Sequence, residues 1–336
     1  DRFFQHLNGS DLSEQQITKA AFCKARKNLK YQAFIELNQT LCQAVVEHST
    51  ARWNGYRICA VDGSTLNLPN QPHLRGHFQP DAVHRPQARA SQLFDVLNQV
   101  TLEATLSPMS TDERSLALQH LPHTLEGDLI LYDRGYPAFY LFAAHLQAGR
   151  HFCVRSPWNL YNETRDFYRS GARELRVVIH PSAKATRDCL ELGLPTEPVE
   201  VRLVRVDLPN DETEILITSV ADLPAEVFPA LYHLRWGVEE DYKRVKARLL
   251  VEQFSGHSVE AVQQDFHAKI LSKNLAAVLA QAAQPIVDQE TAHRRHPYRV
   301  NFSQALSGLK HVLPKWLSSV PLPDDYLARL VRMVSK

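Results

Sequence analysis

The chain has 336 residues, of which 44% are hydrophobic and 22% are charged, and its formal net charge is +1. This composition is typical of a soluble globular protein with two domains, or with one core and an insertion. No apolar run approaches the ~20 residues that a membrane span requires, and the opening residues lack the features of a signal peptide. Five scattered cysteines without a CxxC pair exclude a zinc ribbon and a disulfide framework, and favour reduced thiols in a cytoplasm.

The small net charge hides an uneven distribution along the chain. Residues 1–60 contain eight Lys or Arg against five Asp or Glu, and residues 286–336 contain eight against four. The middle of the chain is therefore net acidic. Because local rather than total charge decides whether a surface binds phosphates, the basic ends permit a DNA partner but do not require one.

Helices are predicted for the first fifty residues. Ser13 is a possible N-cap of the first helix, and a second helix is predicted over residues 31–47. Basic residues interleave with the apolar positions before it: Lys24, Arg26, Lys27 and Lys30. Two interpretations remain open for this region, a small DNA-binding helical unit and a helical bundle with a solvated basic face.

Strands and helices alternate over the next hundred residues. Strands are predicted at residues 56–68, 91–97, 99–105, 128–132 and 151–155. Helices are predicted at residues 111–121 and 138–147. The resulting order, β-β-β-α-β-α-β, resembles the ribonuclease-H-like core, so the predicted fold class is α/β with a mixed sheet.

The second half of the chain changes character twice. Residues 156–222 predict an inserted antiparallel β-rich subdomain, with strands at 175–180, 199–206 and 214–220. One long helix is then predicted over 224–252, and the rest is predicted to be helical with breaks near Pro285, Pro297, Pro314 and residues 321–323. The predicted organisation is a helical N-terminal region, a core in two parts around the insertion, and a helical C-terminal region, with the bounds 1–55, 56–155, 156–222, 223–285 and 286–336.

Two acids follow matched apolar runs in the predicted core. Residues 58–61 precede Asp62, residues 129–132 precede Asp133, and a glycine follows closely in both segments. If the two strands are adjacent and parallel, their carboxyl ends bring both carboxylates together where open α/β sheets place ligands. Two close carboxylates repel, and a divalent cation such as Mg²⁺, which prefers oxygen ligands, removes that cost. The alternative is that each aspartate only caps a turn.

The predicted long helix carries a third acid. At ~100° per residue, one arc of about 60° holds four polar residues: Tyr232, Arg235, Glu239 and Lys246. The adjoining arc is apolar and predicts a face that packs on the sheet: Leu234, Val238, Tyr242, Val245 and Leu249. A carboxylate among cations suits a metal ligand, Glu239, flanked by the phosphate-binding side chains Arg235 and Lys246. The alternative is a solvated face with salt bridges, because Arg235 and Glu239 have the i,i+4 spacing.

The spacing of the four polar residues matches a known signature. Tyr232-x₂-Arg235-x₃-Glu239-x₆-Lys246 resembles the Y-(2)-R-(3)-E-(6)-K signature of a large group of DDE insertion-sequence transposases. The segments VDGS at 61–64 and YDRGY at 132–136 are similar to the blocks that hold the first two acids in that family. The β-rich piece is similar to the insertion that interrupts its ribonuclease-H-like core. The resemblance extends from about residue 21 to residue 313, which is nearly the whole chain.

This resemblance implies a cut-and-paste DNA transposase. Asp62, Asp133 and Glu239 would hold two Mg²⁺ ions, with Mn²⁺ able to substitute, for strand cleavage at terminal inverted repeats and strand transfer into target DNA. Three further residues would contact the DNA: Tyr232, Arg235 and Lys246. The implied partners are double-stranded DNA, as transposon ends and target, and a second copy in a synaptic homodimer; the implied location is the bacterial cytoplasm. The resemblance also implies a hairpin intermediate, formed when the freed 3′-OH attacks the opposite strand.

Two alternatives remain open. Another ribonuclease-H-like endonuclease would carry the same acids, but the cations around Glu239 and the β-rich insertion count against it. A non-catalytic DNA-binding remnant or domesticated transposase is the second alternative, and the retention of all three acids counts against it. Two neighbours of the acids, Arg134 and Trp236, are interpreted as packing residues.

Overall fold

Two compact units make up the chain: a sheet unit, Ser49–Arg244, and a helical unit that combines Asp1–His48 with Val245–Lys336. The computed structural model describes residues 18–207, 212–317 and 325–335. Ser13, the predicted N-cap, and the predicted break at 321–323 lie outside these residues. Within the described ranges, no helix is both long enough and apolar enough to cross a membrane.

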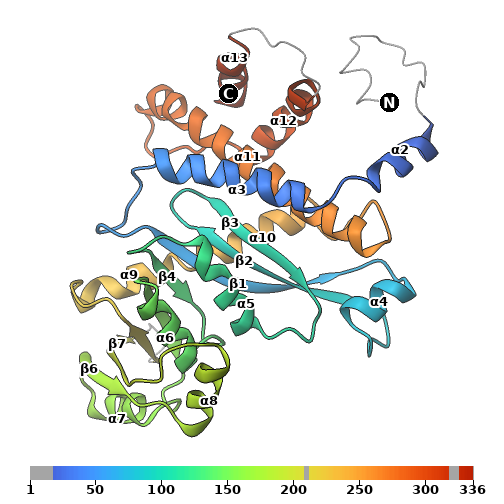
Figure 1. Cartoon of the computed structure of the whole chain (residues 1–336). Coiled ribbons are helices and arrows are strands. Elements are labelled where there is room, and N and C mark those ends of the chain that lie inside the picture. Colours follow the sequence, from blue (N-terminus) through green and yellow to red (C-terminus); the bar gives the residue numbers. More distant parts are fainter. Residues whose placement is uncertain (1–17, 208–211, 318–324, 336) are drawn as a thin grey trace. The chain divides into compact units, whose positions relative to one another are not determined.

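An eight-stranded mixed sheet organises the sheet unit (Figure 1). Its strand order is β3-β2-β1-β4-β5-β8-β7-β6. The strands are β1 (Ile58–Asn67), β2 (Gln87–Asp95), β3 (Val100–Ser107), β4 (Leu129–Tyr132), β5 (His151–Ser156), β6 (Glu174–Ile179), β7 (Val199–Asp207) and β8 (Thr213–Thr218). β1, β2 and β3 form an antiparallel meander, and β4 and β5 continue it in parallel with β1. This is the predicted ribonuclease-H-like arrangement, and the five predicted core strands are confirmed.

The central strands are apolar because both faces of the sheet are covered. All four residues of β4 are buried, as are the first four of β1, which is the pattern expected for parallel strands between two layers of helices. β1 pairs with β4 only up to Ala60, and its second half continues to Asn67 in antiparallel register with β2. The predicted strand over residues 56–68 is therefore confirmed, and Asp62 lies just beyond the last residue that pairs with β4.

Helices from different parts of the chain cover the two faces. On one face, α5 (Glu113–His120) packs on β2 through a buried contact between Ser91 Oγ and His120 Nε2 at 2.8 Å. On the opposite face, α10 (Trp236–Ala247) approaches β2 closely at Gly237, where a Cβ atom would lie 3.1 Å from Val96 Cγ1. Glycine at this position thus brings the first turn of α10 down onto the sheet.

The inserted strands continue the core sheet. β8 pairs antiparallel with β5, β7 with β8, and β6 with β7. The three predicted strands are confirmed, but three short helices were not predicted: α4 (Pro72–Phe78), α7 (Asn162–Ser170) and α8 (Ala183–Glu191). α8 begins at the N-cap Ser182 and buries only Cys189 among its nine residues. Its nine residues are fewer than the window of about 11–18 residues over which helical periodicity is recognised.

The helix predicted over residues 224–252 is broken. It consists of η2 (Ala225–Val227), α9 (Phe228–His233) and α10. Between α9 and α10 the backbone bonds span three residues: Arg235 N–H donates to Tyr232 O, and Val238 N–H donates to Arg235 O, each at 3.1 Å. This short stretch is a tighter 3₁₀ turn, so the angles of one continuous helix do not hold across it. The prediction of one long helix is wrong.

The helical unit contains α2 (Lys19–Arg26), α3 (Gln32–His48), α11 (Val259–Thr291), α12 (Phe302–Leu317) and α13 (Tyr326–Ser335). The predicted second helix is confirmed by α3, and α11, α12 and α13 share an apolar core. The breaks predicted at Pro285 and Pro314 are wrong, because α11 and α12 run through them. Pro285 lies on the exposed side of α11, so the carbonyl that loses its backbone partner can reach water. The predicted break near Pro297 is confirmed between α11 and α12.

Candidate active site

Asp62 and Asp133 lie level with each other on neighbouring strands. The last parallel pair of β1 and β4 is Ala60 with Leu131, and each aspartate is two residues further along. Residues two apart on a strand share a face, and adjacent strands lie ~4.8 Å apart. The two carboxylates therefore leave the same face of the sheet at the same height, as the matched sequence patterns predicted.

Asp62 faces α10 and the other two acids. Its backbone carbonyl accepts a hydrogen bond from Tyr242 Oη of α10 at 3.2 Å, and its Oδ1 accepts one from Gly63 N–H at 2.9 Å. The pKa of the Asp62 carboxyl is raised to about 6, mainly by burial and also by the negative charges of Glu239 and Asp133, whereas the Gly63 N–H and Arg235 oppose the shift. The surroundings of Asp62 thus make its negative charge costly in the absence of a cation.

Asp133 is balanced by positive charge instead. Arg155, at the end of β5, donates from Nη2 to Asp133 Oδ1 at 2.9 Å. Burial by itself would raise the pKa of Asp133, but the Arg134 N–H and the guanidinium groups of Arg155 and Arg235 outweigh burial and lower it. Tyr232 Oη also donates to Oδ1, at a long 3.4 Å. Asp133 is consequently a stable anion at neutral pH.

Glu239 lies in the first turn of α10 and pairs with Arg235. Arg235 Nη2 donates to Glu239 Oε1 at 2.6 Å, and its guanidinium lies over the Tyr232 ring at 5.6 Å from the ring centre. The i,i+4 salt bridge that was the alternative interpretation is therefore present. It is not a solvated one, because only 5% of the Arg235 side chain is exposed and its charge influences both aspartates.

The oxygen donors of Asp62, Asp133 and Glu239 are those that Mg²⁺ and Mn²⁺ prefer, and carboxylates supply the charge that such an ion neutralises. Across the described residues, however, no three His, Cys, Asp or Glu side chains are grouped closely enough to hold an ion. Arg155 and Arg235 each contact an oxygen of one acid, Asp133 and Glu239 respectively. The donor set fits the ion in kind.

Lys246, the last residue of the signature, lies near the end of α10, beyond the boundary between the two units. The structure therefore brings Tyr232, Arg235 and Glu239 to the aspartates but does not place Lys246 among them. Trp236 is 51% exposed, so its interpretation as a packing residue is wrong.

Three residues of the site were missed by sequence analysis: Tyr136, Arg155 and Glu214. The Tyr136 hydroxyl is buried near Asp62 and Asp133 and has no hydrogen-bond partner among the described residues. Arg155 follows the apolar run of β5 just as the aspartates follow those of β1 and β4, so its signal was available. Glu214 begins rather than ends an apolar run, because its strand is antiparallel to β5.

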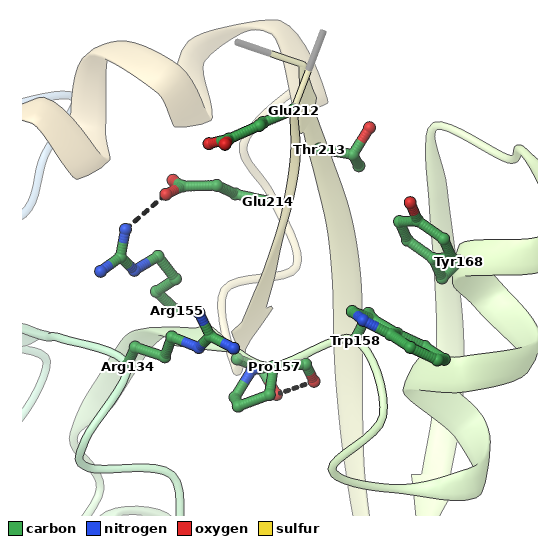
Figure 2. Close-up of a pocket in the computed structure, with 9 residues that line it drawn as sticks. Arg134, Arg155, Pro157, Trp158, Tyr168, Glu212, Thr213 and Glu214 are labelled. Atoms are coloured by element: carbon green, nitrogen blue, oxygen red, sulfur yellow. Dashed lines mark hydrogen bonds and ion pairs between the residues drawn. The ribbon is translucent and has the colours of Figure 1, made fainter. Parts of the chain in front are cut away.

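Two cavities border the site and share Arg155 and Glu214 in their walls. One, of about 420 Å³, also contains Asp133, Arg235 and Glu239. The other, of about 430 Å³, is lined by Arg134, Trp158 and Tyr168. Figure 2 shows this second cavity, with the Arg155–Glu214 ion pair and Arg134 on one side and the two aromatic rings facing them. Arg134, interpreted from the sequence as a packing residue, lines this cavity.

Comparison with known proteins gives the family to which the chain belongs. A family model described as "Transposase DDE domain" matches residues 53–275. A curated protein named "Putative transposase y4zB", from Sinorhizobium fredii (strain NBRC 101917 / NGR234), is 22% identical over 213 residues, which cover 62% of this chain and 54% of that protein. A solved piggyBac transposase synaptic complex with hairpin DNA aligns with a TM-score of 0.45 and 7% identity, over 83% of this chain and 57% of the other.

The family match spans all the sheet strands and the three acids, and it covers well over half of the chain. The chain belongs to the DDE transposase family. It spans about half the length of the curated relative that it matches. The narrower assignment to the Y-(2)-R-(3)-E-(6)-K group rests on the spacing of four residues and stays a prediction.

Proposed function

We propose that this protein is a cut-and-paste DNA transposase, which cleaves strands at the terminal inverted repeats of its transposon and joins them to target DNA. Asp62, Asp133 and Glu239 are the proposed catalytic carboxylates and ligands of two Mg²⁺ ions, for which Mn²⁺ is expected to substitute. The proposed partners are double-stranded DNA and a second copy of the chain, because two transposon ends must be held together. The proposed place of action is the bacterial cytoplasm, where the chromosome lies.

The observation that carries this proposal is the level pair of aspartates facing α10. Two strands fix Asp62 and Asp133 on one face, and Gly237 lets α10 approach until Glu239 influences the charge on Asp62. A carboxylate cluster on a rigid sheet, completed by a helix, suits an ion that must be held in a narrow geometry. The family match supports transposition over other reactions of such a cluster.

When bound, the two ions supply an activated water or 3′-hydroxyl and stabilise the leaving oxygen. The protein contributes position and charge. Arg235 is already desolvated beside two of the acids, and its buried Nε–H has no acceptor among the described residues, so it is placed to donate to a phosphate oxygen. Tyr232 lies against the same guanidinium, and Lys246 is proposed to extend the DNA contact along α10.

The test uses a linear duplex that carries the DNA flanking this gene, where short inverted repeats are expected. Asp62→Asn, Asp133→Asn and Glu239→Gln should each abolish Mg²⁺-dependent nicking of this duplex while sparing its binding. Glu240→Gln is the matched control, since Glu240 is the exposed neighbour of Glu239 and pairs only with Lys243 among the residues that the structure describes. Normal cleavage by any one of the three variants would refute the assignment of that residue.

Joining separates transposition from simple hydrolysis. The same reaction with a supercoiled plasmid as target should yield products in which the cleaved 3′ ends are covalently attached to plasmid strands. Nicking without any joined product would favour a ribonuclease-H-like endonuclease instead. Binding without nicking, in Mg²⁺ and in Mn²⁺, would favour a non-catalytic remnant.

A further inference from the structure

A charged row crosses four neighbouring strands at the level of the acids. β4 and β5 pair in parallel, with Leu131 opposite Cys153, so Arg155 stands level with Asp133 just as Asp133 stands level with Asp62. On the next strand Arg155 lies opposite Leu216, and Glu214 is two residues away on the same face. The order across β1, β4, β5 and β8 is therefore acid, acid, arginine, acid.

Arg155 joins the two acids on either side of it. Its Nη2 donates to Asp133 Oδ1 at 2.9 Å, and its Nη1 donates to Glu214 Oε1. Asp133 is a proposed metal ligand, whereas Glu214 comes from the last of the inserted strands. The guanidinium thus spans the boundary between the core and its insertion.

This pairing differs from that of a structural arginine in the same unit. Arg57 is buried, donates through Nε and Nη2 to Asp128, and has a second acid, Asp95, at 3.8 Å. Arg155 is 30% exposed, and its Nε, although buried, has no acceptor among the described residues. Buried arginines that only support a fold normally have their donors satisfied, so an incomplete set at a cavity wall indicates a side chain that changes partners.

We propose that Arg155 is the resident counterion of the metal-free site, which occupies Asp133 until a divalent cation takes that carboxylate, and that Glu214 then holds the displaced guanidinium beside the site. This inference rests on the proposed function, because it assumes that Asp133 is a metal ligand. A cation ~2.1 Å from an Asp133 oxygen repels a guanidinium that contacts the same oxygen. The cavity lined by Arg134 and Trp158 gives the guanidinium room to turn while it keeps Glu214.

The consequence is that metal affinity depends on two residues that do not bind the metal. Arg155 competes with the ion, so its removal should tighten binding. Glu214 draws Arg155 away from Asp133, so its removal should leave Arg155 more firmly on Asp133 and weaken binding. The inserted strands thereby act directly on the catalytic centre, through Glu214 at the start of β8.

The experiment titrates Mn²⁺ alone, without DNA, into the full chain and measures free Mn²⁺ by electron paramagnetic resonance. Arg155→Gln should bind Mn²⁺ about threefold to tenfold more tightly than the unmodified chain, the range that a partly exposed ion pair supports. Arg155→Lys keeps the positive charge but loses the forked guanidinium that reaches both acids. Its Mn²⁺ affinity should lie between that of Arg155→Gln and that of the unmodified chain. Thermal unfolding without metal checks that each variant is folded.

Glu214→Gln should weaken Mn²⁺ binding about threefold. Glu212→Gln is its matched control, because Glu212 lines the same cavity and carries the same charge but is not bonded to Arg155 (Figure 2). In a chain that also carries Arg155→Gln, Glu214→Gln and Glu212→Gln should change the Mn²⁺ affinity equally. Equal effects in the unmodified chain would overturn the role of Glu214.

Unchanged or weaker Mn²⁺ binding by Arg155→Gln would overturn the competition itself. Asp133→Asn separates this failure from failure of the proposed function. If Asp133→Asn loses Mn²⁺ binding while Arg155→Gln gains none, the metal site stands and the counterion does not. If Asp133→Asn binds Mn²⁺ as the unmodified chain does, both the metal site and the inference fail.

Discussion

Removing the charge of Asp62 should stabilise the metal-free fold, whereas removing the charge of Asp133 should destabilise it. The two carboxylates are chemically alike and stand level on adjacent strands, but their surroundings oppose each other. Burial and two neighbouring acids make the Asp62 anion costly, and Arg155 with the Arg134 N–H makes the Asp133 anion favourable. Asp62→Asn and Asp133→Asn are therefore each other's matched control.

The magnitude follows from the pKa of Asp62. It is 3.8 ordinarily and about 6 in the folded chain, a rise of about 2 units, and each unit corresponds to ~1.4 kcal/mol. Below pH 3.8 the carboxyl is protonated in both states and costs nothing. Between pH 3.8 and 6 only the folded state keeps the proton, so stability falls as pH rises. Above pH 6 the full cost, about 3 kcal/mol, is present, and Asp62→Asn escapes it.

The sign is reversed for Asp133. A lowered pKa means that the folded state favours the anion, so this contribution is present above pH 3.8 and is lost as pH falls through the folded value. Asp133→Asn removes it and leaves Arg155 with Glu214 alone. Because both members of the Arg155–Asp133 pair are about one-third exposed, the loss is discounted to ~1 kcal/mol.

The assay is urea unfolding in a metal chelator, followed by circular dichroism at pH 4.5, 6 and 7.5. At pH 7.5 Asp62→Asn should exceed the unmodified chain in unfolding free energy, Asp133→Asn should fall below it, and the Asp62→Asn advantage should shrink towards pH 4.5. An advantage that is absent at pH 7.5, or equal gains for both variants, would show that the acids are not in these opposite environments.

Three further predictions concern neighbours of the acids. Tyr136→Phe removes a buried hydroxyl without a partner among the described residues, so thermal unfolding should show unchanged stability or a gain of up to ~1 kcal/mol; a loss above ~2 kcal/mol would contradict this. Gly237→Ala places a Cβ 3.1 Å from Val96 Cγ1 and should slow Mg²⁺-dependent nicking several-fold. Val96→Ala in the same chain should restore the nicking rate; no recovery would show that this contact does not position α10. Lys246→Ala should weaken binding to duplexes of any sequence and lower the salt slope of the affinity by about 1; an unchanged slope would exclude a phosphate contact.

The sequence was sufficient for the two aspartates because parallel strands follow a simple rule. A charged residue directly after an apolar run marks the carboxyl end of a buried parallel strand, where ligands bind in open α/β sheets. Both Asp62 and Asp133 follow such a run. Arg155 fits the same rule on β5, where the apolar run ends in a cation rather than an acid. Glu214 could not be found this way, since an antiparallel strand reaches that end of the sheet with its first residues.

The arrangement around Glu239 could be predicted only in part. The four-residue spacing predicted that Tyr232, Arg235, Glu239 and Lys246 share one face, but it assumed one helix with a constant turn. The structure inserts a 3₁₀ turn at Leu234 and Arg235, with the close packing of Gly237 on the sheet immediately after it. Such a turn is set by tertiary contacts, which helix propensity and periodicity do not contain. Tyr232, Arg235 and Glu239 still meet, because Arg235, in the turn before α10, bonds to Glu239 in the first turn of α10, and its guanidinium lies over the ring of Tyr232 in α9.

The direction of the inserted strands explains why α9 and α10 must follow them. β5 runs towards the acids and ends at Ser156, whereas β8 runs the other way, from Ile215 opposite Ser156 to Thr218 opposite Cys153. The chain therefore leaves the sheet at the end of the strands that is remote from the acids. A helix that starts there must run back along a face to reach them, and α9 brings Tyr232 to within 3.4 Å of Tyr132 O, the residue before Asp133. The 3₁₀ turn then occurs at the level of the aspartates, so that α10 begins with Glu239 in its first turn. With an even number of inserted strands, the last strand would end at the same end of the sheet as the acids. No helix would then run back along the sheet face to carry Glu239 to the aspartates.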